Sequence, residues 1–223
     1  MKFLTTILAI VLSLSLTAKE NAFTGYIINK KGQRIEGKIK TRNVTVDQMK
    51  ITFIEKQTKI VYKPADLIGY GYEHKGENEF GEDTYVWRHY KSKTAQSYAP
   101  RFYASKEVFM EIMEEGEVVL YDYYVEVPGD IENPYKRFFY MEKNGSDELI
   151  EISQENYVEI TSIYLENHSD LSDKIGTVNH RFRHLWKIVR LYNSWSEIQE
   201  VNTRMADMTE ETIESEHSEI KPF

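Results

Sequence analysis

The pattern of apolar and polar positions changes about two thirds of the way along the chain. From residue 23 to residue 152, short segments alternate apolar and polar side chains, and loops with Gly, Pro or Asn separate them. This period of two predicts strands with one buried face. From Ser153 onward, apolar residues recur every three or four positions, which predicts helices. We therefore expect an α+β fold, with a mostly antiparallel β-sheet or partly closed barrel followed by C-terminal helices.

The expected strands follow one another closely and are predicted to pair as hairpins. Asn29 to Gly32 is typical of a hairpin loop, and Asn144-Gly145 suits a tight primed turn. Gly69 and Gly71 would share one face of their strand, where a neighbouring backbone or ring can approach closely. The expected strands are 23–28, 34–40, 50–54, 59–62, 68–72, 84–90, 118–127, 137–143 and 149–152.

Two segments within this region do not show strand alternation. Residues 73–84 form the most polar internal stretch and are expected to be a loop. Residues 106–115 are expected to be a short helix, with Ser105 as its N-cap and a left-handed Gly116 at its end. The apolar stripe that favours this helix consists of Val108, Phe109, Ile112 and Met113.

Helices are predicted over most of the last seventy residues. Ser153 is the candidate cap of the first helix, residues 169–175 form a second that ends at Gly176, and residues 180–192 form a third. Beyond it the chain is acidic, with apolar residues at helical spacing for three more turns and disorder expected after them. These apolar residues are Ile198, Val201, Met205 and Met208.

The first residues resemble a secretory signal peptide. Lys2 supplies a positive charge, an apolar run follows from Phe3 to Leu16, and Ala18 is a small residue suited to cleavage. The alternative is an uncleaved membrane anchor, but the run is shorter than the roughly 20 residues that span a bilayer. We expect export to the periplasm, the cell surface or the medium, with no transmembrane span after cleavage.

Composition narrows the possible functions. The chain has 223 residues, no cysteine and a net charge of −8. It therefore cannot form disulfides, use a catalytic thiol or carry the lipid of a bacterial lipoprotein, and an acidic chain is a poor general binder of nucleic acid. The 16 Tyr and 10 Phe fit half-buried strands, with a carbohydrate-stacking surface as the alternative.

The domain organisation follows from these patterns. We expect a signal peptide at 1–18, a single α+β domain at 19–195 and an acidic tail at 196–223 that is partly helical or disordered. Within the domain, residues 23–152 are expected to be β-rich and residues 153–195 helical.

Several of these segments recur in a familiar order. They are Gly25 to Ile28, Gly32 to Ile39, Pro64 to Tyr72, Phe109 to Tyr121, Leu171 to Ile175 and Ile188 to Asn193. In this order they resemble an uncharacterised family of exported proteins of Gram-negative bacteria. The resemblance covers residues 23–193 and implies a bacterial, exported chain in which strands precede helices. It implies no activity and no site.

A basic cluster stands out on the third predicted helix of this acidic chain. It consists of Arg181, Arg183, Lys187 and Arg190. One interpretation is a solvated helix face that pairs with acids of the tail. The other is a docking patch for an acidic partner or a polyanionic glycan.

Three further groups contain residue types that are found at metal or catalytic sites. His180 and His184 would share a helix face at a zinc-binding spacing, but no Glu follows the first His and arginines lie between them. The 73–84 loop is rich in calcium-type oxygen ligands but lacks EF-hand spacing. Asp122 lies among tyrosines, where burial would raise its pKa; the alternative is a solvent-side acid paired across the sheet.

We predict no catalytic residue, no cofactor and no metal site. The function favoured by the sequence is that of a non-enzymatic envelope or secreted protein that binds an unknown protein or glycan partner. One alternative is a hydrolase that acts on cell-wall or polysaccharide material through scattered acids. Another is a structural accessory protein whose acidic tail docks elsewhere.

Overall fold

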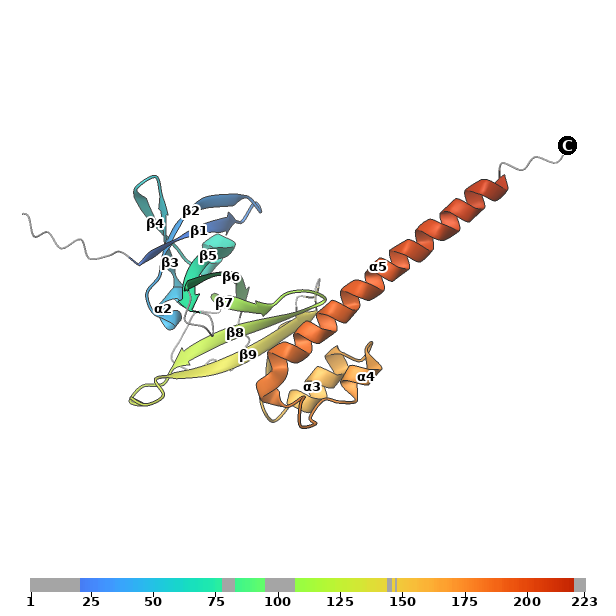
Figure 1. The fold of residues 1–223 in the computed structure, drawn as a ribbon. Helices are drawn as coiled ribbons and strands as arrows, with labels where there is room; N and C mark the ends of the chain where they lie inside the picture. Colours follow the sequence, from blue (N-terminus) through green and yellow to red (C-terminus); the bar gives the residue numbers. More distant parts are fainter. Residues whose placement is uncertain (1–20, 78–82, 95–106, 144–145, 147, 219–223) are drawn as a thin grey trace, which may run out of the picture.

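The computed structural model describes residues 21–77, 83–94, 107–143, 146 and 148–218. One antiparallel sheet of ten strands, in the order β10-β9-β8-β7-β6-β5-β1-β2-β3-β4, is followed by helices (Figure 1). The sheet is not closed, so the α+β prediction is confirmed in its open form. The strands are β1 (Ala22–Asn29), β2 (Arg34–Lys40), β3 (Ile51–Glu55), β4 (Thr58–Tyr62), β5 (Leu67–Glu77), β6 (Asp83–Thr94), β7 (Glu107–Glu114), β8 (Val118–Glu126), β9 (Tyr135–Lys143) and β10 (Ile150–Ile152).

The predicted hairpins form as expected in the first half of the sheet. Gly32 takes the left-handed conformation, with φ of 77°, that the turn between β1 and β2 requires. The glycines of β5 have the expected role as well. A Cβ on Gly71 would lie 2.8 Å from the ring of Tyr26, and one on Gly69 would lie 2.2 Å from the carbonyl oxygen of Tyr90. The absent side chains let a ring and a neighbouring strand approach β5.

The helix predicted at 106–115 is wrong, because this segment is the strand β7. Its apolar residues satisfy both periods: Phe109 faces one core while Val108 and Met110 face another, and all three are buried. Pairing with β6 and β8 therefore overrides the helical spacing. Gly116 does not adopt a positive φ, and the proposed cap Ser105 lies outside the described residues.

The loop predicted at 73–84 is also wrong where the structure describes it. Residues 73–77 extend β5, residues 83 and 84 begin β6, and the two strands pair from Gly69 to Glu77. Residues 78–82, on which the calcium hypothesis depends, lie outside the described part of the chain, as do residues 1–18 and the Asn144-Gly145 turn.

Three helices cover one face of β8, β9 and β10. They are α3 (Tyr157–Tyr164), α4 (Ser169–Ser172) and α5 (Leu185–Ser218). The core between helices and sheet includes Leu120, Met141, Leu185, Val189 and Tyr192. Asn193 of α5 fixes the docking, because its side chain donates to the carbonyl of Val118 at 2.8 Å and accepts from its N–H at 2.9 Å. A polar side chain of α5 thus satisfies both main-chain hydrogen-bonding groups of the first residue of β8.

The last helix differs from its prediction at both ends. Residues 180–184 are not part of it; a short 3-10 helix, η2 (Phe182–His184), precedes α5 instead. α5 then runs for 34 residues, well past the three extra turns expected. Figure 1 shows it leaving the sheet and projecting alone toward the C-terminus. Gly176 has the predicted left-handed conformation, with φ of 88°.

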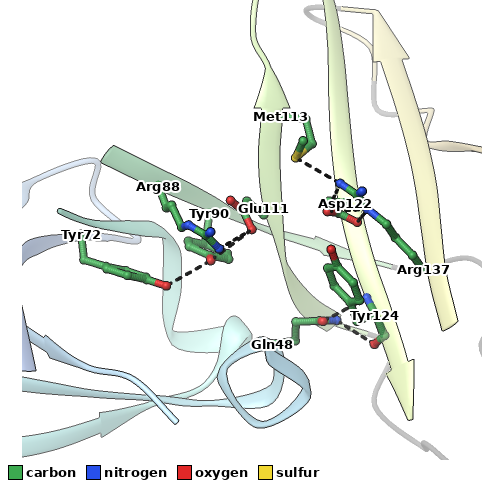
Figure 2. Close-up of polar contacts among 9 residues, drawn as sticks. All are labelled: Gln48, Tyr72, Arg88, Tyr90, Glu111, Met113, Asp122, Tyr124 and Arg137. Carbon is green, nitrogen blue, oxygen red and sulfur yellow. Dashed lines mark hydrogen bonds and ion pairs between the residues drawn. The ribbon is translucent and has the colours of Figure 1, made fainter. Parts of the chain in front are cut away.

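A short helix, α2 (Val44–Met49), is inserted where β7 and β8 diverge. Asn43 caps it by accepting from the N–H of Val46 at 2.8 Å. Gln48 is buried and bonds to both main-chain groups of Tyr124, accepting from the N–H at 3.0 Å and donating to the carbonyl at 3.2 Å (Figure 2). The glutamine thus replaces the strand neighbour that β8 lacks here.

Candidate binding groove

A groove of about 620 Å³ opens between the sheet and the start of the helical region. One wall comes from β7 and β9, and the other from η2 and the first turns of α5. Its lining residues are Met113, Glu114, Arg137, Phe139, Phe182, Arg183, Leu185, Trp186 and Arg190. We call this the aromatic groove, because three large rings and three guanidinium groups line it.

The rings of the groove are held by edge-to-face packing. Phe139 of β9 and Phe182 of η2 lie 5.7 Å apart at 79°, and Phe182 makes a second such contact with Tyr157 of α3. The hydroxyl of Tyr157 donates to the carbonyl of His180 at 2.6 Å, which fixes the chain just before η2. The walls are therefore joined by aromatic contacts from three elements.

Arg137 is held in place by the buried carboxylate of Asp122. The Nε atom of Arg137 donates to both oxygens of Asp122 at 2.9 Å, and an Nη atom lies 2.6 Å from one of them (Figure 2). The guanidinium lies over the ring of Phe139 at 4.6 Å, and 42% of the Arg137 side chain remains exposed. The Asp122 side chain is only 2% exposed. The cross-strand pairing expected for Asp122 is correct, but its expected solvent-side position is wrong.

The predicted basic cluster does not form one helix face. Arg183 and Arg190 line the aromatic groove, whereas Arg181 and Lys187 do not. The reason is that Arg181 and Arg183 precede α5, so the four residues do not share a helical period. Arg190 pairs with Glu114 of β7 at 2.5 Å and lies 5.0 Å from the Trp186 ring centre. A strand acid, rather than the tail, thus partners this arginine.

A polar chain continues from the groove across the same face of the sheet. The hydroxyl of Tyr90 donates to Glu111 at 3.3 Å, Arg88 lies 3.5 Å from the same carboxylate, and the Tyr72 and Tyr90 hydroxyls are 3.4 Å apart (Figure 2). Burial raises the pKa of Glu111; the charge of Arg88 opposes this shift, and Asp122 adds to it. Glu111 and Asp122 are register partners on neighbouring strands.

The histidine pair does not form the expected helical zinc face, because α5 begins only at Leu185. His184 Nε2 accepts from Arg183 at 3.1 Å, and its Nδ1 is buried without a hydrogen-bond partner. Among the described residues there is no cluster of three or more His, Asp or Glu side chains arranged to hold a metal. In the same part of the chain, no helix combines the length and apolar character needed to cross a bilayer.

Two of the groove arginines, Arg183 and Arg190, belong to the basic cluster predicted from the sequence, whereas the other lining residues do not. Phe182 falls within the helix predicted at 180–192, and Arg137 and Phe139 fall within the strand predicted at 137–143. A local signal existed in both segments, since Arg137-Phe138-Phe139 and Arg183-His184-Leu185-Trp186 each place an arginine two or three positions before a ring. Nothing in the sequence indicated that these segments meet.

Comparison of this chain with protein-family models, curated proteins and solved structures finds no match. The family resemblance drawn from the sequence stays a prediction.

Proposed function

We propose that this chain is an exported envelope or secreted protein that binds an acidic glycan in the aromatic groove without catalysing a reaction. The observation that carries the proposal is the alternation of guanidinium groups and aromatic faces along one groove. Aromatic faces pack against the C–H faces of sugar rings, and arginines bind carboxylates through paired hydrogen bonds. A uronic acid offers both kinds of surface.

Charge supports an acidic ligand over a neutral one. Three arginines line the groove, whereas Glu114 pairs with Arg190 and Asp122 pairs with Arg137, so Arg183 leaves this region with a net positive charge although the chain carries −8 overall. The Nε atom of Arg183 donates to His184 at 3.1 Å, and the side chain is exposed. Its guanidinium has donors left for a carboxylate.

Isothermal titration calorimetry with oligosaccharides tests the proposal. Uronic-acid oligomers are compared with neutral oligomers of the same length and with an acidic peptide. We expect binding of the uronic-acid oligomers alone, weakened by salt because exposed charges are screened. Equal binding of the neutral oligomers would remove the role of the arginines, and binding of the peptide alone would indicate a protein partner.

Arg183 and Arg181 provide a matched pair of variants. Both are exposed and lie two residues apart, but only Arg183 lines the groove. Arg183→Ser should weaken uronic-acid binding about tenfold, the loss expected for one charge-assisted hydrogen bond. Arg181→Ser should leave it unchanged. Equal losses in the two variants would mean that net charge, rather than the groove, attracts the ligand.

One observation supports a second candidate, a polysaccharide hydrolase. Glu111 and Asp122 are two carboxylates on neighbouring strands, and the pKa of Glu111 is raised, as a general acid requires. Against this, Asp122 is held by Arg137, and neither acid lines the aromatic groove. Release of reducing ends from an acidic polysaccharide that is abolished by Glu111→Gln would establish the hydrolase. Release that survives this change would exclude Glu111 and Asp122 as its catalytic acids.

A further inference from the structure

The surface of α5 carries an apolar stripe that begins at Leu191, in its docked first turns, and continues onto the projecting part of the helix. The exposed fractions are 54% for Leu191, 58% for Ile198, 48% for Val201, 63% for Met205 and 68% for Met208. From Leu191 onward the stripe has the heptad spacing of a two-stranded coiled coil, with Ser194 at the remaining position. Figure 1 shows α5 leaving the sheet after its first turns, and no other element lies beside its C-terminal half. A single long helix in water gains most of its stability from packing such a stripe.

We propose that two copies of this chain dimerise through these stripes as an antiparallel coiled coil. In this dimer Ile198 of one copy packs against Val201 of the other, and Leu191 packs against Met208. Ser194 lies opposite Met205. Every exposed apolar residue of the stripe is then covered by an apolar residue or by the short serine side chain.

Charged residues beside the stripe select the orientation and the register. Glu197 directly precedes Ile198, and Arg204 directly precedes Met205, so both flank the stripe on the same side. In the antiparallel register given above, Glu197 of each copy faces Arg204 of the other, which makes two ion pairs. The Arg204 side chain is 75% exposed and also contacts Glu200 at 3.1 Å. Its guanidinium has enough donors to bind Glu200 and the partner copy's Glu197 together.

The alternative arrangements lack this complementarity. Sliding one helix by a heptad in one direction places Arg204 opposite its own copy, and sliding it in the other direction places Glu197 opposite its own copy. Like charges in these positions repel. In a parallel pair, Glu197 would face Asn202 and Arg204 would face Thr209, which gives no ion pair. The pattern is therefore specific for one antiparallel dimer.

Cysteine cross-linking tests the geometry on a clean background, since the chain has no cysteine. Leu191→Cys and Met208→Cys are prepared separately and then mixed under mild oxidation. The antiparallel dimer predicts a disulfide-linked species in the mixture only, because two copies of position 208 lie about 25 Å apart along the axis. Cross-linking of Met208→Cys with itself would indicate a parallel dimer and overturn the proposal.

Charge reversal tests the register. Sedimentation equilibrium of the full chain should give a monomer–dimer equilibrium. Glu197→Arg should raise the dimer dissociation constant at least about tenfold, because two ion pairs become two repulsions. The double variant Glu197→Arg/Arg204→Glu should return it to within about threefold of the wild type. Failure of this rescue, or a wild-type chain that stays monomeric at every concentration, would overturn the proposal. Both side chains are exposed, and circular dichroism confirms the fold of each variant.

Discussion

The pair between Asp122 and Arg137 offers the sharpest test of how the groove is held. Asp122 is 2% exposed in its side chain, and its oxygens lie 2.6–2.9 Å from the guanidinium. Replacing Arg137 by Leu would keep much of its packing against Phe139 but leave a buried carboxylate without its counter-charge. Breaking a buried pair in this way costs about 3–5 kcal/mol.

The structure narrows the loss of unfolding free energy expected for Arg137→Leu. Two unit charges about 4 Å apart attract by about 4 kcal/mol at an effective dielectric constant of about 20. The Arg137 side chain is 42% exposed, so solvent screens part of this attraction. We therefore expect Arg137→Leu to lower the free energy of unfolding by about 3 kcal/mol at pH 7. The double variant Asp122→Asn/Arg137→Leu should recover most of this loss, because no buried charge remains.

Urea unfolding followed by tryptophan fluorescence measures both variants. The midpoint for Arg137→Leu should fall while the slope stays constant, since the surface exposed on unfolding is unchanged. A loss below about 1 kcal/mol at pH 7, or a double variant as unstable as the single one, would refute the reasoning.

Three further variants test other parts of the fold. Burial raises the pKa of Asp47 to about 6, whereas Asp titrates near 3.9 in an unfolded chain. The stability that this group contributes is therefore lost as the pH rises from about 4 through 6. After allowance for partial exposure, Asp47→Asn should stabilise the protein by about 1–2 kcal/mol at pH 8. Urea titrations should show no such gain at pH 4. Gly69→Ala should lower the free energy of unfolding by about 3 kcal/mol, because the new Cβ would lie 2.2 Å from the carbonyl oxygen of Tyr90. Gly76→Ala is the control, because its Cβ would have no atom nearer than 3.7 Å. Equal melting temperatures of the two variants would contradict the close approach. Asn193→Ala should lower the free energy of unfolding by about 2 kcal/mol, because two main-chain groups of β8 lose their partner. Hydrogen exchange at the start of β8 should then accelerate. Unchanged exchange would argue against this docking contact.

The sequence was sufficient to predict which neighbouring strands pair as hairpins. It was ambiguous at β7, where the apolar spacing fits both a helix and a strand. Phe109 and Val108 are both buried because β7 has cores on both faces, and a strand of this kind has no alternation to read. The polar residues at 73–77 resemble a loop, because residues 83–87 of β6, which pair with them, are not visible in a local pattern.

The groove could not be predicted for a similar reason. Arg137 and Arg190 are far apart in the sequence, and they meet only because α5 packs across β8 through Asn193. The sequence identified the basic character of residues 181–190, but it placed all four cations on one helix. The start of α5 at Leu185, which follows the 3-10 turn of η2, decides which of them face the groove.

The central claim is that the groove around Trp186 receives an acidic sugar, and the indole N–H signals of the protein test it most directly. The chain has three tryptophans, of which Trp87 is 38% exposed on a different part of the sheet and stacks on His89. In a ¹H–¹⁵N NMR titration with a uronic-acid oligosaccharide, the account predicts a saturable shift of the Trp186 indole signal while that of Trp87 stays in place. A shift of Trp87 alone, or no saturable shift of Trp186, would contradict it.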